Sequence, residues 1–395
     1  MAEVTAVNAL KTIVDQIDDR LSSEYCKGKR IIWFGFTVYI DIIQKALISR
    51  NKRIHFVIDN DPNKWGWILQ DELVIFPPKQ ILSGFGEDAV VLVSSRHKEK
   101  MKEQLKEEYG YDDKQIIVLL SQEESEQLAH DALRKELAGL TVIEHRELQL
   151  VELDILKAFR EFCDRNQLRY FLAGGTLLGA VRHRGFIPWD DDMDVYLPYE
   201  DYVKFFELYP SGGRYDAVDW KRSDGYCLPY GKLVDTFTIL EHGGYPVCWL
   251  QGVSIDIFPI SGYPKEEKDI LRKIDGNRGL DARWYWYYNA KGVINTPLED
   301  IRAEILTLKY NQSFYCSPNI GASHILHKDG KEKPQWTSPY EAFAERVFLE
   351  FEGDIFAAPV GYDEHLKTRY GDYMEIPSEE EQIMHSFPAY WRYRK

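Results

Sequence analysis

Residues 186–201 read FIPWDDDMDVYLPYED, with three consecutive aspartates and a fourth two residues later at the start of an expected strand. In an extended strand successive side chains alternate between faces, so Asp192 and Asp194 would share one face, about 6–7 Å apart. Met193 and Val195 would point the other way, into a core. Two carboxylates on one face repel each other unless a proton or a hard cation lies between them. The pattern predicts a strand that binds Mg²⁺, or alternatively Mn²⁺.

A glycine turn precedes the aspartates. An apolar helix (148–168) leads into a short strand, RYFLAGG, and then into a short helix, TLLGAVRHRGF. Glycines between a strand and a helix allow backbone N–H groups to approach a phosphate. We therefore take Gly174 and Gly175 as candidate phosphate-side residues, with Thr176 either capping the helix or contacting the phosphate. An ordinary strand-to-helix turn is the alternative.

A third acid stands on a later apolar stretch, GVSIDIFPI (252–260). Asp256 lies there between Ile255 and Ile257, where a lone carboxylate is costly to bury unless it is paired or binds a metal. Two acids on one strand and a third on another form the carboxylate triad of a nucleotidyltransferase-type site, in which metal ions neutralise a transferring phosphoryl group. The alternative is a solvated acidic loop with an unrelated aspartate.

Basic residues flank the expected acidic strands. Arg182, His183 and Arg184 come just before the aspartates, and Lys232 lies in YGKLVD on an expected strand between the two acidic ones. Guanidinium and ammonium groups suit a diphosphate. Salt bridges to the nearby aspartates explain these residues equally well.

The N-terminal third alternates short apolar strands with helical segments: RIIWFGF, YIDIIQKALIS, RIHFVIDN, DAVVLVSS, KEKMKEQLKEEYG and QIIVLL. This alternation is typical of parallel βαβ units and predicts a Rossmann-like domain. Gly35 stands alone where a dinucleotide fingerprint has three glycines. Asp59 follows at about the ~20-residue spacing of a ribose-binding acid. The Asp-Asn-Asp-Pro sequence there is also explained by turn chemistry alone, so NAD is not expected.

Composition limits the classes of function. The 395 residues are 44% apolar and carry a formal charge of −15, which argues against a nucleic-acid partner. Five cysteines without a CxxC pair fit a reducing compartment. We identify neither a signal peptide nor an apolar run near the ~20 residues that a spanning helix needs. We therefore expect a cytoplasmic protein that contacts a membrane at most peripherally.

The sequence resembles the LicD/fukutin-related phosphotransferases in three segments: LAGGTLLGAVRHRGFIPWDDDMDVYLPYEDY (172–202), GVSIDIFPI (252–260) and FEGDIFAAPVGYDEHLKTRYGDYMEIP (351–377). The resemblance spans about residues 145 to 380. It implies a nucleotidyltransferase-like α+β fold and an enzyme that moves phosphocholine, or a related phospho-alditol or phosphoethanolamine group, from a CDP-activated donor to a sugar hydroxyl.

Position by position, Asp192 and Asp194 match the two-acid metal motif and Asp256 matches the third acid, while Gly174, Gly175 and Thr176 match the phosphate-side turn. The chain departs from the family at Tyr199, where the family often has an arginine, so the group transferred can differ from phosphocholine. Asp191 or Asp256 is the candidate general base. Asp190 and Asp191 can instead cap or orient the loop.

These inferences give an α/β chain with a Rossmann-like domain of unassigned role at 1–125, a connecting helix at 126–145 and a LicD-like catalytic domain at 146–395. The expected acceptor is a cell-surface glycan or its lipid-linked precursor, as in teichoic acid or lipopolysaccharide synthesis. A metal-dependent glycosyltransferase and a non-catalytic glycan- or nucleotide-binding protein are the alternatives. The aromatic segment RWYWYY (283–288) either stacks against sugar rings or lies at a membrane interface, with helical core packing as the alternative. The tail AYWRYRK is either a membrane-surface segment or an exposed chain end. His324 and His327 lack the companions of a zinc site.

Overall fold

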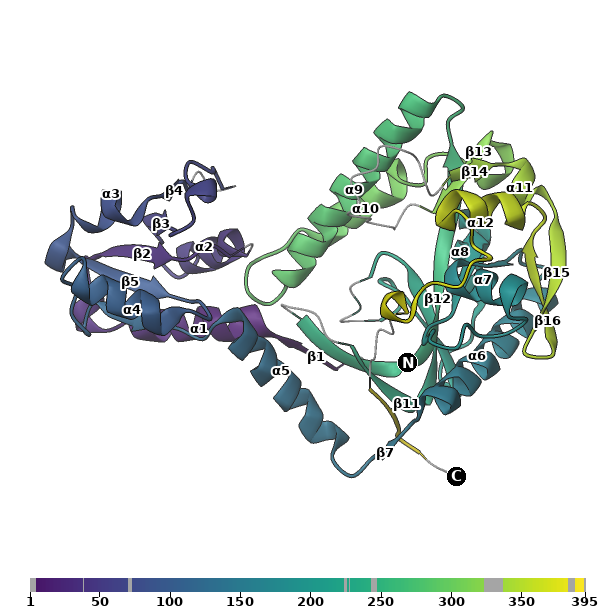
Figure 1. Ribbon diagram of the computed structural model, residues 1–395, viewed down its shortest axis with the longest axis horizontal. Coiled ribbons are helices and arrows are strands. Elements are labelled where there is room, and N and C mark those ends of the chain that lie inside the picture. Colours follow the sequence, from purple (N-terminus) through teal and green to yellow (C-terminus); the bar gives the residue numbers. More distant parts are fainter. Residues whose placement is uncertain are drawn as a thin grey trace.

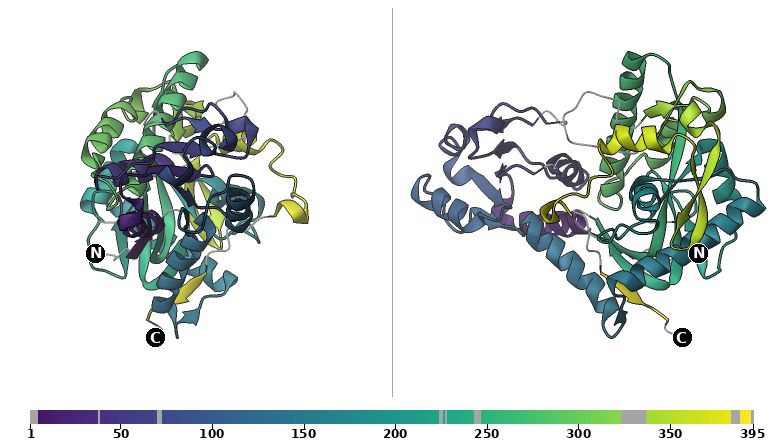
Figure 2. Two further views of the ribbon diagram at one scale, coloured as in Figure 1. Left: turned by 90° about the vertical axis from the view of Figure 1, so that its left-hand side faces the viewer. Right: turned by 45° about the vertical axis from the view of Figure 1, so that its right-hand side comes forward.

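The computed structural model describes residues 5–37, 39–69, 73–223, 226, 228–242, 247–322, 337–382 and 388–393. Two lobes lie side by side along the long axis of the molecule (Figure 1). The smaller lobe is built around a parallel sheet, and the larger lobe around a mixed sheet. A long helix, α5 (Gln122–Leu137), runs between them along one side, as a second view also shows (Figure 2).

The parallel sheet of the small lobe confirms the Rossmann-like prediction. Its strand order is β4-β3-β2-β5-β6, and every neighbouring pair is parallel. Helices α1 and α2 cover one face, and α3 and α4 cover the other. Both faces are therefore buried, which explains the uninterrupted apolar run AVVLV. The elements are α1 (Ala9–Leu21), β2 (Arg30–Phe34), α2 (Ile40–Ile48), β3 (Phe56–Ile58), β4 (Ile75–Phe76), α3 (Pro78–Leu82), β5 (Ala89–Val93), α4 (Lys98–Glu107) and β6 (Ile116–Val118).

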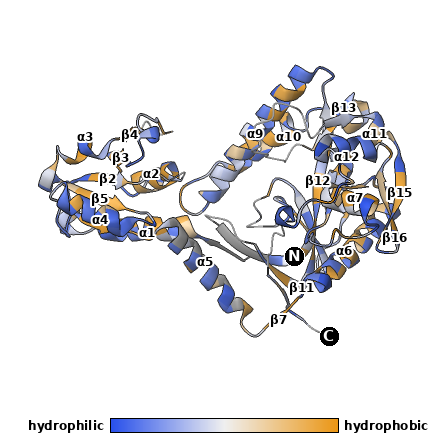
Figure 3. Cartoon of the chain, viewed as in Figure 1, coloured by the Kyte–Doolittle hydropathy of each residue, from blue (hydrophilic) through white to orange (hydrophobic). Residues whose placement is uncertain are grey.

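Polar and apolar residues separate along these elements. The sheet strands β2 and β5 are largely hydrophobic, whereas α4 and α5 carry much hydrophilic surface (Figure 3). Helix α5 begins with a capping box, because Ser121 and Glu124 each satisfy the other's backbone N–H. The polar composition of α5 suits a helix that runs between two lobes rather than through a core.

Two contacts connect the lobes in a way the sequence pattern did not reveal. The first strand, β1 (Thr5–Asn8), does not join the parallel sheet but pairs antiparallel with β12 of the large lobe. Conversely, two residues of the large lobe, Ala290 and Val293, pack into the apolar cluster of the small lobe beneath α1 and α2. The division at 1–125, 126–145 and 146–395 remains a prediction.

The large lobe contains, within the described residues, a ten-stranded mixed sheet. Its longest strand, β12 (Val247–Tyr263), pairs parallel with β9 and antiparallel with β1, β11 and β13. The remaining elements are β7 (Thr141–Val142), α6 (His145–Arg165), β8 (Phe171–Leu172), α7 (Gly174–Arg182), β9 (Asp194–Pro198), α8 (Tyr199–Leu208), β10 (Tyr215–Val218), β11 (Gly231–His242), α9 (Glu267–Asn289), α10 (Leu298–Leu308), β13 (Asn319–Ala322), β14 (Thr337–Pro339), α11 (Glu341–Ala344), β15 (Arg346–Phe351), β16 (Asp354–Pro359), α12 (Tyr362–Tyr370) and β17 (Ala389–Trp391).

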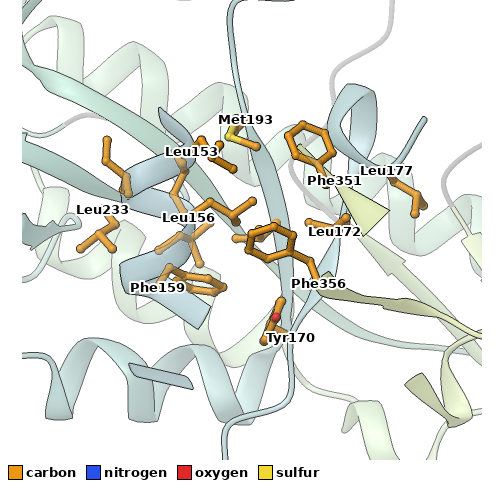
Figure 4. Close-up of a cluster of buried hydrophobic side chains, with 14 of the residues drawn as sticks. Leu153, Leu156, Phe159, Tyr170, Leu172, Leu177, Met193, Leu233, Phe351 and Phe356 are labelled. Atoms are coloured by element: carbon orange, nitrogen blue, oxygen red, sulfur yellow. The ribbon is translucent and has the colours of Figure 1, made fainter. Parts of the chain in front are cut away.

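The main core of this lobe lies between α6 and the sheet. Leu153, Leu156 and Phe159 of α6 pack there with residues from the strands, including Leu233, and with Phe351 and Phe356 of the β15–β16 hairpin (Figure 4). Met193 is 1% exposed and lies in the same cluster. The predicted alternation around the aspartates is therefore present in the structure.

The two aromatic segments serve packing in the described structure. Trp284 and Tyr288 of α9 are buried in a cluster with α10. The tail segment Ala389–Trp391 is a strand, β17, which pairs with β11 and β7. An exposed chain end is therefore wrong for residues 389–391, whereas Tyr393 is exposed. Contact of either segment with sugars or a membrane stays a prediction. None of the helices in the described ranges is both long and apolar enough to cross a membrane. His324 and His327 lie outside the described residues.

Candidate active site

Asp194 and Asp256 lie opposite each other on parallel neighbouring strands, β9 and β12. The two strands are joined at this point by a hydrogen bond from Asp256 N to Met193 O of 2.8 Å. Strand β9 begins at Asp194, so Asp192 lies two residues before the strand instead of within it as predicted. The register brings together two acids that are more than sixty residues apart in the chain, which is the pairing that the triad prediction requires.

The Gly-Gly turn lies directly against these carboxylates. A Cβ atom on Gly174 would meet Asp194 Oδ2 at 2.2 Å, and one on Gly175 would meet Asp190 Oδ2 at 2.3 Å. Gly174 also has a φ of +54°, which other residues rarely adopt. The N-terminus of α7 thus faces negative charge, which its dipole favours. Glycine is therefore needed at both positions because aspartate side chains occupy the space that a Cβ atom would take. The sequence analysis explained these glycines by phosphate binding alone.

Thr176 does not cap α7. The cap position is Ala173, and the buried Thr176 hydroxyl accepts a hydrogen bond of 2.8 Å from Asp194 N. This bond fixes the backbone at the start of β9. Thr176 therefore positions Asp194, and a direct phosphate contact by Thr176 stays a prediction.

Lys232 pairs with the third acid. It lies opposite Asp256 in the antiparallel β11–β12 ladder, and its Nζ is 2.6 Å from Asp256 Oδ1. The lysine side chain is 6% exposed. Of the two explanations given for Lys232, the salt bridge is the one present in the structure. The contact leaves Asp256 Oδ2 as the oxygen without this partner.

The electrostatic environment raises the pKa of Asp194 well above its ordinary value. Burial is the largest cause, followed by the negative charges of Asp192 and Asp256, while Arg369 of α12 opposes the shift. A pKa raised by like charges indicates that several carboxylates converge on one region. Arg369 comes from the C-terminal segment of the resemblance and was not among the predicted site residues.

Glu152 is a second residue that the sequence reasoning missed. It lies on the core-facing side of α6, is 2% exposed, and has an Oε2 atom without a hydrogen-bond partner. Burial raises the pKa of its carboxyl, and the charges of Asp192, Asp191, Asp190 and Asp256 raise it further. A glutamate at an apolar position of an amphipathic helix was the available signal, since such a residue is rarely buried without a purpose.

The basic residues predicted to lie beside the aspartates, Arg182, His183 and Arg184, have different surroundings in the structure. Arg182 donates to the backbone oxygens of Tyr373 and Glu375, at 2.9 and 3.1 Å. Burial and the charge of Arg182 lower the pKa of His183. Arg184 is exposed at a turn with a φ of +58°. The structure gives Arg182 an anchoring role for residues 373–375, and the phosphate contacts of all three stay predictions.

The aspartate loop itself is held from α6. Gln149 Nε2 donates to Asp190 O at 2.9 Å, and Asp190 N donates to Ile187 O at the same distance. Asp190 and Asp191 thus lie in an ordered loop beside α7 and Glu152. This agrees with the alternative that Asp190 orients the loop. The role of Asp191 as general base stays a prediction.

The donor atoms suit a hard divalent cation. Asp192, Asp194 and Asp256 offer carboxylate oxygens, which Mg²⁺ prefers, and the buried Glu152 Oε2 adds an oxygen without a partner. Within the described residues no group of three or more His, Cys, Asp or Glu side chains is placed so that it could hold a metal ion. The donor atoms fit the ion in kind, and Mg²⁺ binding by these residues stays a prediction.

Acids on two parallel strands beside a Gly-Gly helix N-terminus define a nucleotidyltransferase-type domain. A family profile described as "LicD/FKTN/FKRP, nucleotidyltransferase domain" matches residues 167–278. The chain is 30% identical over 252 residues to the lipopolysaccharide cholinephosphotransferase LicD of Haemophilus influenzae, covering 61% of this chain and 95% of that protein. The chain therefore belongs to the LicD family.

Two further relatives match shorter segments. The ribitol 5-phosphate transferase FKRP of Homo sapiens is 56% identical over 34 residues, which is 9% of this chain and 7% of that protein. An uncharacterized protein of Rickettsia typhi is 41% identical over 69 residues, or 18% of this chain and 22% of that protein.

Proposed function

We propose that the chain transfers a substituted phosphate group from a CDP-activated donor to a hydroxyl of a cell-surface glycan or of its lipid-linked precursor, in a reaction that depends on Mg²⁺. The observation that carries the proposal is the register of Asp194 and Asp256 on neighbouring parallel strands, next to the Gly174–Gly175 turn. Relatives named as a cholinephosphotransferase and a ribitol 5-phosphate transferase support the reaction class. Phosphocholine, phosphoethanolamine and a phospho-alditol are the candidate groups.

Phosphoryl transfer depends mainly on positioning and on neutralising charge. Asp192, Asp194 and Asp256 would hold the cation, which when bound neutralises charge on the transferring and leaving phosphates. The chain's own residues supply the remaining parts. Lys232 fixes the Asp256 carboxylate by their 2.6 Å contact, and Thr176 fixes the backbone of Asp194.

A hydroxyl nucleophile must lose its proton during attack, and a carboxylate within hydrogen-bond reach can accept it. Asp191 and Asp256 are the two candidate bases, and Lys232 engages one oxygen of Asp256. Contact with a membrane-bound acceptor would be peripheral.

The test is CMP release by the full-length protein from CDP-choline, CDP-ethanolamine and CDP-ribitol, with a glycan acceptor and after removal and return of Mg²⁺. We expect one donor to be used, and Asp192→Asn and Asp256→Asn to reduce release at least ~100-fold. Asp154→Asn, an exposed acid on α6, is the matched control and should be active. Calorimetric Mg²⁺ titration of the same variants gives a readout independent of turnover.

Release of UDP or GDP from sugar nucleotides, with no CMP from any donor, would instead establish the glycosyltransferase alternative. Binding of nucleotide or glycan without any turnover would establish the non-catalytic one.

A further inference from the structure

A cavity of about 550 Å³ opens in the small lobe at the carboxyl ends of β2, β3 and β5. It lies where the strand order reverses, since β3 pairs with one side of β2 and β5 with the other. Ligands of open parallel sheets bind at this switch point, and the volume is within the ~300–1,000 Å³ of small-molecule sites. The LicD-family match begins at residue 167, so it assigns nothing to this cavity.

One wall of the cavity is positively charged. Arg96 and Lys100 line it, and neither forms an ion pair with an acidic residue in the described part of the chain. Arg96 Nε instead donates to His97 Nε2 at 3.1 Å. Lys64 also lines the cavity, but it pairs with Asp59 at 3.4 Å and Asp61 at 3.5 Å. In a chain of net charge −15, two cations at one cavity without acidic partners favour an anionic ligand.

Apolar residues also line the cavity: Trp33, Phe36, Ile43 and Met101. Of these, Phe36 is an aromatic side chain that is only partly buried, and its ring packs edge-on against Trp67, with ring centroids 5.7 Å apart. A ligand that satisfies both the cations and this ring has a phosphate at one end and a flat, weakly polar group at the other, which is the chemistry of a nucleotide.

The loop chemistry distinguishes this site from a dinucleotide fold. The Asp59 carboxylate already accepts hydrogen bonds from Phe36 N at 2.7 Å and Asp61 N at 2.8 Å. These hydrogen bonds fix the shape of the loop, and they occupy both carboxylate oxygens of Asp59, which leaves few lone pairs to accept from ribose hydroxyls. The Asp59 spacing therefore reflects turn chemistry, and a single glycine, Gly35, gives no pyrophosphate loop.

We propose that the small lobe binds a mononucleotide, with its phosphate against Arg96 and Lys100 and its base against Phe36. The site is separate from the carboxylates of β9 and β12, and the proposal does not depend on the transferase reaction.

The test is calorimetric titration of the full-length Asp256→Asn variant with CMP, UMP, AMP and GMP, and with inorganic phosphate as the fragment probe. The substitution removes a candidate ligand of the transferase site, so binding there contributes less. We expect one-to-one binding of at least one nucleotide. Adding Arg96→Gln and Lys100→Gln should weaken binding about 100-fold, at roughly tenfold for each charged contact.

Lys102→Gln is the matched control. Lys102 lies on α4, as Lys100 does, but it pairs with Asp113 at 3.0 Å and does not line the cavity. It should leave the affinity unchanged. The proposal is wrong if no nucleotide binds, or if the double substitution has no larger effect than Lys102→Gln. Equal affinity for inorganic phosphate and for the nucleotides would refute the part of the proposal in which the cavity binds the base.

Discussion

Asp194 and Asp256 stand in register on parallel strands, and the backbone of one strand is hydrogen-bonded to the other immediately beside them. Parallel strands lie ~4.8 Å apart, so side chains at paired positions are neighbours. Like charges so close are unfavourable for the fold, and they are retained where a site needs them.

Neutralising Asp194 should therefore leave the stability of the fold unchanged or higher while activity is lost. Asp194→Asn removes the repulsion by Asp192 and Asp256 that helps to raise the pKa of Asp194. We expect thermal denaturation at or above the wild-type Tm, together with loss of CMP release. A lower Tm with activity retained would contradict a functional reason for this cluster.

Replacing Gly175 by alanine tests the contact between α7 and the aspartate loop. The new Cβ would be 2.3 Å from Asp190 Oδ2, so the Asp190 carboxylate must move away from α7. We expect activity to fall steeply while the far-UV circular dichroism spectrum is preserved. Gly276→Ala, in α9 with no atom within 4 Å of the added Cβ, should raise stability by about 0.5–1 kcal/mol and leave activity unchanged. Equal effects of the two substitutions would refute this account.

The pairing of α9 and α10 depends on a buried ion pair. Lys309 is 0% exposed, and its Nζ lies 2.7 Å from Asp281 Oδ1. Lys309→Met leaves a buried carboxylate unpaired and should reduce the free energy of unfolding by about 3–5 kcal/mol, measured by urea denaturation. The exposed pair of the same two helices, Arg283 and Glu304 at 2.8 Å, supplies the control. Arg283→Met should change stability by no more than ~1 kcal/mol.

Acid should destabilise the fold through His365. Burial, and secondarily the charge of Arg369, lowers its pKa to about 4 from 6.5. Above pH 6.5 the ring is neutral in both the folded and the unfolded chain. As the pH falls from 6.5 to about 4 the unfolded chain takes up the proton first, so stability is lost over this window, on the order of 3 kcal/mol in full.

In His365→Gln this part of the pH dependence should disappear, as measured by Tm between pH 4 and 7. His97→Gln, at an exposed position, is the control and should keep the wild-type slope. An unchanged slope in His365→Gln would show that other groups cause the acid sensitivity.

Features that short stretches of sequence encode could be predicted without the structure. Alternation of apolar strands with helices gave the parallel sheet of the small lobe, and alternation around Met193 gave the buried and acidic faces at β9. The resemblance in residues 172–202 and 252–260 indicated the family, since family motifs are short contiguous segments. These inferences need only neighbouring residues, whose side-chain directions follow from strand and helix geometry.

Which distant residues meet follows only from the folded arrangement of the chain. The antiparallel register of β11 and β12 assigns Lys232 to Asp256, and the packing of α6 on the sheet brings Glu152 to the aspartates. Strand β1 joins the large sheet instead of the sheet that follows it in sequence. Such contacts depend on which distant segments pair and pack together, and the periodicity of one segment does not name its partner.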